Sequence, residues 1–257
     1  MKKSIFSLSV FLVISMAASA QFSGGIKAGG NYTNVVGDGV GHEYVPGWHV
    51  GAFGEYEVSQ LLSVQAEIVY SVKGFRAKYS KATPNPLGTL VEDWDVPCKF
   101  TYVDVPLMLN IHFGSMGSYI GLGPQLSFLM SAGSDGKLTS TTTFTGPPAS
   151  SKSTDVTIAD SDTKGYSGTD FSFVLGTGAK WDSGIEYCIR AGYGLTNMID
   201  QTIPPTATSF LWYHKAESWH NLVFTVSLGY AFGKQGGGGG GGGDRYGHKY
   251  NSRTKHR

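Results

Sequence analysis

Apolar and polar residues alternate with a period of two along most of the chain. The segment 101–114 (TYVDVPLMLNIHFG) shows the pattern well. Alternate positions from Thr101 are almost all apolar, whereas the positions between them include Asp104, Asn110 and His112. A period of two predicts β-strands with two chemically different faces.

Eight such segments follow one another, and the connections between them alternate in length. The segments are 22–34, 46–57, 62–77, 99–113, 118–130, 169–181, 184–196 and 219–233. Tight turns are expected at 58–61, 114–117 and 182–183, and long loops at 35–45, 78–98, 131–168 and 197–218. Short turns on one side and long loops on the other are typical of an outer-membrane barrel. The pattern predicts an all-β fold, an eight-stranded antiparallel up-and-down transmembrane β-barrel, with ten strands as an alternative.

The composition of the two faces decides which side of the sheet points outward. The polar faces carry isolated ions and many glycines, among them Gly121, Gly123, Gly176, Gly178, Gly192 and Gly194. Small residues with sparse ions fit the cramped lumen of a narrow barrel, so we expect the apolar faces to contact lipid. Aromatic residues near the ends of the apolar faces fit interface girdles: Trp48, Tyr56, Phe113, Trp181, Tyr230 and Phe232. A soluble β-sandwich, the alternative, predicts outward faces crowded with Lys, Glu, Thr and Asp.

The ends of the chain have a different composition from the centre. Lys2 and Lys3 precede an apolar stretch and an Ala-x-Ala site at 18–20, which predicts a cleaved signal peptide over 1–20. The barrel is expected over 21–233. A glycine run and a basic end follow at 234–257, which predicts a flexible linker and tail.

The chain contains two cysteines, Cys98 and Cys188. The strand map places them near opposite ends of their strands. A disulfide requires Cα atoms within about 7 Å, so two free thiols are expected.

The inward faces carry charges of both signs. They are Lys27, Glu55, Glu67, Lys73, Asp104, Lys180, Glu186 and Arg190. Such residues can line a pore or a proton path. Eight strands leave room for little beyond side chains, so we interpret them as a closed ionic plug. Pro106 lies on the same face, where a bulge or a lost ladder bond is tolerated.

Candidate catalytic and metal-binding patterns are weak. His214, Glu217 and His220 could bind zinc, but they do not have the spacing of His-Glu-x-x-His on a helix. Ser161 and Lys164 match a Ser-x-x-Lys pattern inside a loop rich in these residues. We therefore predict no catalytic residues, no metal and no cofactor.

Several strand motifs resemble those of a known family. YVDVPLMLNIHFG, SYIGLGPQLSFLM, IRAGYGLTNM and the closing NLVFTVSLGYAF resemble the PorT-like outer-membrane β-barrel family of Bacteroidota. The resemblance covers nearly all of 22–233 and implies an eight-stranded outer-membrane barrel. The founding member is linked to type IX protein secretion, and the same role here would rest on analogy. The chain departs from the family where it continues past Phe232, the expected terminal aromatic residue.

The basic tail is the remaining candidate for contacts. Arg245, Lys249, Arg253, Lys255 and Arg257 could touch anionic lipid or polymers of the envelope, or could have no dedicated partner. Nucleic acid is not expected as a partner in the periplasm. Expected partners are outer-membrane lipid and lipopolysaccharide, the barrel assembly machinery, and an envelope or type IX secretion complex.

Together these features predict a non-enzymatic protein of the Gram-negative outer membrane. Its long loops would face outside and its termini the periplasm. It would act through its loops or as a subunit of an envelope assembly. The alternatives are a small diffusion pore and a hydrolase at the barrel rim.

Overall fold

The structure is a computed structural model that describes residues 21–38, 41–86, 88–114, 117–145, 150–161, 163–202 and 217–232. The predicted signal peptide 1–20 and the tail 234–257, with Arg245, Lys249, Arg253, Lys255 and Arg257, lie outside these residues. Within them no helix is long and apolar enough to cross a membrane.

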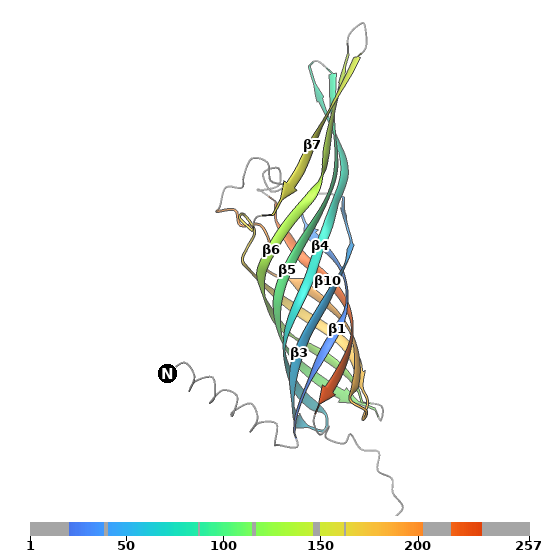
Figure 1. Cartoon of the computed structure of the whole chain (residues 1–257), viewed down its shortest axis with the longest axis vertical. Helices are drawn as coiled ribbons and strands as arrows, with labels where there is room; N and C mark the ends of the chain where they lie inside the picture. Colours follow the sequence, from blue (N-terminus) through green and yellow to red (C-terminus); the bar gives the residue numbers. More distant parts are fainter. Residues whose placement is uncertain are drawn as a thin grey trace, which may run out of the picture.

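The described chain forms ten strands (Figure 1). They are β1 (Phe22–Gly37), β2 (His42–Glu43), β3 (Val45–Ser59), β4 (Leu62–Asn85), β5 (Gly88–Phe113), β6 (Ser118–Phe144), β7 (Ser150–Asp160), β8 (Thr169–Lys180), β9 (Ile185–Gly194) and β10 (Trp219–Phe232).

Eight of these strands close into an antiparallel barrel. Neighbours pair in the order β1, β3, β4, β5, β6, β8, β9 and β10, and β10 pairs again with β1. β2 pairs with β4 and β7 with β6, outside this circuit. The predicted eight-stranded barrel is therefore confirmed, and two further strands are added to it.

The two ends of the barrel differ. At one end, here the turn end, Gln60–Leu61, 114–117 and 181–184 connect strands tightly. At the other, the loop end, the connections range from two residues at 86–87 to the long segment 195–218, and three barrel strands continue far beyond the rest. In Figure 1, β4, β5 and β6, joined by β7, rise as a sheet above the closed barrel.

The prediction that 78–98 and 131–168 are long loops is wrong over most of their length. Tyr79 pairs with Trp94 in the extended β4–β5 hairpin, and Leu138 pairs with Val156 in the β6–β7 hairpin. Ser, Thr and Gly in these stretches suggested loops. Threonine, however, is a good strand former, and the long strands bring their inner side chains into a shared cluster.

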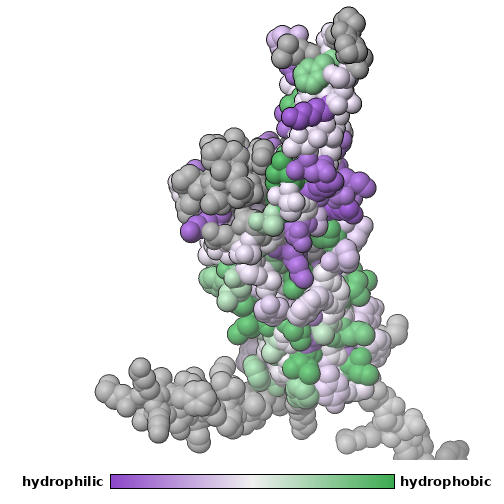
Figure 2. All heavy atoms as spheres, turned by 45° about the horizontal axis from the view of Figure 1, so that its top comes forward, coloured by the Kyte–Doolittle hydropathy of each residue, from purple (hydrophilic) through white to green (hydrophobic). Residues whose placement is uncertain are grey.

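The outer wall of the barrel is apolar, as the alternation predicts. Val226 is 57 % exposed and Leu109 is 37 % exposed, whereas their neighbour Asn110 is buried inside. The six aromatic residues predicted as girdles are all exposed on this wall. Figure 2 shows hydrophobic side chains gathered over the barrel and hydrophilic ones over the protruding sheet.

Two local features of the wall lie beside the buried ionic side chains Glu67 and Arg190. The β4–β5 register has no partners for Val105 and Pro106, so the ladder is interrupted opposite Glu67. A Cβ added to Gly176 would lie 2.5 Å from Cγ of Arg190, so only glycine leaves space for the arginine there. Both cysteines are buried and free, as expected.

Candidate functional site

The lumen of the barrel is the candidate functional site. The structure places all eight predicted ionic residues there, and each side chain is almost completely buried. Asp170, which the sequence analysis did not single out, joins them and is 3 % exposed. The charged groups form three levels along the barrel axis, and several strands contribute to each level.

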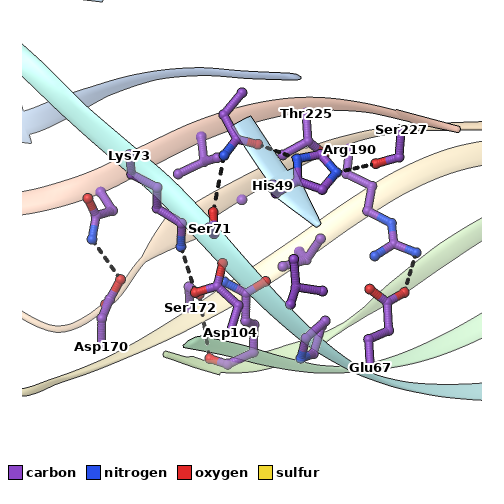
Figure 3. Close-up of a pocket in the computed structure, with 18 of the residues that line it drawn as sticks. His49, Glu67, Ser71, Lys73, Asp104, Asp170, Ser172, Arg190, Thr225 and Ser227 are labelled. Atoms are coloured by element: carbon purple, nitrogen blue, oxygen red, sulfur yellow. Dashed lines mark hydrogen bonds and ion pairs between the residues drawn. The ribbon is translucent and has the colours of Figure 1, made fainter. Parts of the chain in front are cut away.

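The central level is an ion triad. Glu67 on β4 forms an ion pair with Arg190 of β9, whose nitrogen lies 2.8 Å from Oε1 (Figure 3). Its other oxygen, Oε2, pairs with Lys27 of β1. The carboxylate of Glu67 is fully buried. Two cations therefore share one carboxylate in the middle of the lumen, and each would be uncompensated without it.

The level near the turn end joins Glu55 and Lys180. Lys180 Nζ lies 2.7 Å from Glu55 Oε2 and donates to Ser23 at 3.1 Å. The hydroxyl of Ser63 donates to Glu55 Oε1 at 2.6 Å and lies 2.8 Å from Nε2 of His112. Glu55, Lys180, Ser63 and His112 are thus joined across strands.

Glu186 lies at the same level, opposite Lys180 in the strand register, but forms no salt bridge among the described residues. Its Oε1 accepts the hydroxyl of Tyr119 at 2.6 Å. Its Oε2 has no hydrogen-bond partner among the described residues. A Cβ on Gly178 would lie 2.7 Å from the Tyr119 hydroxyl oxygen, so glycine at this position lets the ring reach Glu186.

The level nearest the loop end contains two acid groups. Lys73 pairs with Asp104 at 2.8 Å. Asp170 Oδ2 accepts the amide of Asn221 at 2.9 Å, while its Oδ1 has no hydrogen-bond partner in the described chain. Asp170 lies on the inward face of a predicted strand, two residues before Ser172, so the period of two could have identified it.

A histidine on β3, His49, joins two further polar side chains of the lumen. His49 contacts Asn31 Oδ1 through Nδ1 and Ser227 Oγ through Nε2, both at 2.7 Å (Figure 3). Asn31 in turn donates to Ser71 at 3.1 Å. The four neighbouring strands β4, β3, β1 and β10 are therefore also connected by side chains on their lumen side.

A cavity of about 50 Å³ remains between these levels, lined by ionic, hydroxyl and amide groups from several strands. A buried water needs roughly 10–15 Å³ and two to four polar partners. The cavity therefore has room for a few water molecules and can supply the partners that Asp170 Oδ1 needs. It is too small for a solute pathway.

A hydrophobic cluster closes the lumen at the loop end, and the sequence analysis missed it. Trp219 and Phe75 are completely buried, with ring centroids 5.2 Å apart. Phe100 contacts Tyr166 edge to face, with centroids 4.9 Å apart. The mouth cluster contains Val35, Phe75, Ala77, Trp94, Val96, Cys98, Phe100, Tyr102, Ala132, Leu138, Ile158, Tyr166, Met198, Ile199 and Trp219.

The mouth cluster is held by loops as well as strands. Trp219 Nε1 donates to the carbonyl of Asp38 at 3.0 Å, and its backbone N–H donates to Asn197 Oδ1 at 2.9 Å. The backbone N–H of Met198 donates to the carbonyl of Trp219 at 2.8 Å. Segments far apart in sequence thus meet above the ionic levels, which explains why periodicity alone could not reveal the cluster.

The candidate zinc ligands lie only partly in the described chain. Among these residues there is no group of three His, Cys, Asp or Glu that could hold a metal ion. Glu217 accepts from the Trp219 indole at 3.0 Å, and His220 stacks on Tyr193. His214 lies outside the described residues.

Comparisons with known proteins agree with the barrel. The family described as outer membrane protein beta-barrel domain matches residues 16–200. No curated protein matches the chain.

Three similar solved structures are bacterial proteins. Ail, the attachment invasion locus protein of Yersinia pestis, is 14 % identical over 82 % of this chain and 99 % of its own, with a TM-score of 0.38. Neisserial surface protein A is 9 % identical over 83 % and 98 %, with a TM-score of 0.42. OprG from Pseudomonas aeruginosa is 12 % identical over 82 % and 94 %, with a TM-score of 0.35. Likenesses this weak say nothing about activity.

Proposed function

The chain belongs to the outer membrane protein beta-barrel domain family, and on that premise we propose that it is a closed, non-enzymatic barrel. It acts at the outer face of the outer membrane through its protruding sheet and loops, or as a subunit of an envelope assembly. The observation that carries this proposal is the order of layers in the lumen. Paired ions fill the barrel, and the mouth cluster lies above them.

The layers oppose a diffusion pore for two reasons. An ion that entered from the turn end would have to separate buried pairs such as Lys73 and Asp104. It would then have to cross an apolar layer that includes Phe75 and Trp219, both completely buried. Either step is costly for a hydrated solute.

The arrangement of Ser63, His112 and Glu55 supports the proposal that the protein is not an enzyme. In a hydrolytic triad the carboxylate orients the ring nitrogen remote from the serine. Here Glu55 Oε1 lies 3.7 Å from Nε2, the nitrogen that faces Ser63, and the Ser63 hydroxyl already donates to Glu55. Ser63 is also completely buried, so substrate has no access to it.

A planar-bilayer experiment tests the closed state. We expect the full chain to give no stepwise conductance at neutral pH. The double substitution Phe75→Gly with Trp219→Gly removes two completely buried rings of the mouth cluster and serves as the opened comparison. Stepwise conductance by the unsubstituted protein would establish the diffusion pore instead.

The sidedness follows from the strand directions. Both ends of the described barrel, Phe22 and Phe232, lie at the turn end, which we place in the periplasm. Protease added to whole cells should then cut the connections at 86–87 and 145–149 and spare 58–61. Cleavage at 58–61 in intact cells would reverse the orientation.

The narrower assignment to the PorT-like barrels rests on the strand motifs already quoted. With it come the proposed partners: lipopolysaccharide, the barrel assembly machinery and a type IX or other envelope complex. Cross-linking in intact cells, followed by purification and mass spectrometry, tests them. Recovery of lipid and assembly factors alone would contradict the subunit role.

A further inference from the structure

The protruding sheet has two free edges. Beyond Lys78, β4 pairs with β5 alone among the described strands. On the opposite side β7 pairs with β6 alone from Ser150 to Asp160. Figure 1 shows both strands at the borders of the sheet above the barrel. A free edge presents unpaired backbone N–H and C=O groups, which are a template for another strand.

The two edges differ in how they are protected. The β4 edge carries Lys78, Lys81 and Pro84. Lysines and a proline on an edge strand are the usual devices that prevent further pairing. The β7 edge over 150–157 has no proline, its register with β6 runs without a shift, and its sequence SSKSTDVT holds a single lysine, Lys152. One edge is therefore blocked and the other is left open.

The open edge is also accessible. Every residue from Ser150 to Thr157 is exposed, and burial begins only at Ile158. A strand exposed on both faces gains little from hydrophobic packing. The order of this part of β7 depends on its pairing with β6, and a second neighbouring strand would add backbone hydrogen bonds on the free side.

The contacts between β6 and β7 show which side chains suit this edge. Thr141 and Ser153 hydroxyls lie 2.9 Å apart, and Thr139 donates to Asp155 at 2.9 Å. Lys137 pairs with Asp155 at 2.7 Å, so this carboxylate is already compensated. Lys152 makes no ion pair with any residue that the structure describes. A carboxylate on the incoming strand opposite Lys152 would compensate it.

We propose that the β7 edge, Ser150–Thr157, binds an extended segment of another protein as an added β-strand. The segment is rich in Ser and Thr and carries Asp or Glu opposite Lys152. Main-chain hydrogen bonds provide the affinity, and the charge pair fixes the register. The inference rests on the proposed function, because the edge meets a partner only if the loop end faces outside the cell.

The height of the sheet makes the edge reachable. β4 continues 15 residues past Tyr70, an aromatic residue of the outer wall, to Asn85. At about 3.3 Å per residue this gives at most about 50 Å along the strand. Asn85 pairs with Gly88, Gly88 with Phe144 and Phe144 with Ser150, so the β7 edge begins at this height, beyond the apolar wall.

A synthetic strand tests the proposal on the full chain in lipid nanodiscs. The probe is the blocked, fluorescent peptide Thr-Ser-Thr-Glu-Thr-Ser-Thr-Val-Thr, and fluorescence anisotropy reports its binding. We expect saturable binding that weakens about threefold to tenfold in Lys152→Glu. The same peptide with Lys in place of Glu should bind Lys152→Glu better than it binds the unsubstituted protein. A merely structural role of Lys152 would not give this exchange.

Hydrogen exchange locates the bound strand. Along 150–157 the free protein should show alternate slow and fast amides, because one set bonds to β6 and the other faces the open edge. The peptide should slow the fast set. Ser153→Pro and Thr154→Pro remove one amide of each set. One of them should lose peptide binding with the β6–β7 hairpin intact, and the other should open the hairpin.

Two shortened variants provide matched controls. Replacing 139–155 by Asn-Gly removes the open edge and keeps the Leu138–Val156 pair, so binding should be lost. Replacing 81–92 by Asn-Gly removes the blocked edge, so binding should persist. Binding that survives loss of 139–155 would overturn the proposal. The proposal would also be overturned if the fast-exchanging amides of 150–157 were protected in cross-linked dimers without peptide. The added strand would then belong to a second copy of this chain. If the protein gives no conductance in the planar bilayer and does not bind the peptide, this inference is refuted and the proposed closed barrel is retained.

Discussion

The barrel and the protruding sheet use the same strands with opposite polarity. In the barrel, β4 points Glu67 and Lys73 inward and Ile68 outward. Beyond Gly74 the same alternation points Phe75 inward and Arg76 outward. The inside is ionic below and apolar above, while the outside is apolar below and ionic above. The period of two is constant, and the surroundings change.

The difference in polarity arises because the same strand passes from a lipid environment into water. Where lipid surrounds the wall, an apolar outer face is required and the polar groups must be satisfied inside. Where water surrounds the sheet, the charges move outside and the apolar side chains form a core beneath. The mouth cluster lies at this change and closes the lumen. The exposed pairs Arg76–Asp95 and Lys137–Asp155 have the chemistry of a soluble protein.

The largest expected effect is the loss of the central carboxylate. Glu67→Gln leaves Lys27 and Arg190 buried without a counter-charge, and the free energy of unfolding should fall by about 3–5 kcal/mol. Arg190→Ala should cost less, because Lys27 still compensates Glu67, and it should open no conductance. Urea unfolding in lipid vesicles measures the free energy of unfolding of both variants. The control is Asp95→Asn in the exposed pair, which should leave the stability nearly unchanged. Equal losses of stability in Glu67→Gln and Asp95→Asn would contradict the contrast between the barrel and the protruding sheet.

A core substitution in the mouth cluster should have a slightly smaller effect. Phe75→Ala removes a completely buried ring that packs on Trp219, with an expected loss of about 3–4 kcal/mol. Lys78→Ala, on the outer face of the same strand, is the control and should be tolerated. Thermal unfolding followed by tryptophan fluorescence compares them. A Phe75→Ala protein as stable as the control would show that the cluster is no core.

A charge on the outer wall tests the lipid side of the comparison. Val226→Arg places a cation at the middle of the apolar wall and should cost about 2–4 kcal/mol. Ser80→Arg, on the outer face of the protruding sheet, should cost little because water surrounds it. Heat-modified migration and urea unfolding provide the readout. If Val226→Arg were harmless and Thr225→Leu disruptive, the assignment of the lipid-facing and lumen-facing sides of the wall would be reversed.

The smallest expected effect is an acid sensitivity of the protruding sheet. The hydrogen bond from Arg76 is the main cause that lowers the pKa of Asp95 below its ordinary value. A lowered carboxyl pKa means that the pair stabilises the fold fully above about pH 4. The contribution then fades as the pH falls through the lowered pKa of Asp95. Hydrogen exchange of the β4–β5 tip should therefore speed up, relative to the intrinsic rate, below about pH 4.

Asp95→Asn provides the comparison for this titration. The variant lacks the carboxyl group, so its tip should show no such change over the same pH range. The signal should be absent from the buried barrel amides of either protein at these pH values. An identical acid response in both proteins would assign the titration to another group.

Much of the wall could be predicted from the sequence. The alternation in TYVDVPLMLNIHFG indicated strands with one polar face, and the glycines beside Arg190 and Tyr119 indicated that this face was inside. The position of Cys98 and Cys188 near opposite ends of their strands predicted free thiols, and both are free. These features are local, because adjacent side chains on a strand point to opposite faces whatever the rest of the chain does.

The partners across the lumen were decided by the tertiary structure. Closure of the barrel, with its stagger between strands, determines that Arg190 meets Glu67 and that Tyr119, rather than a cation, meets Glu186. The same closure brings Trp219 onto Phe75, and pairing beyond the closed barrel makes strands of segments that were predicted as loops. Residues at 75 and 219 share no sequence pattern. The alternation of the sequence fixes the face on which each side chain lies, and only the packed barrel fixes which side chain lies opposite.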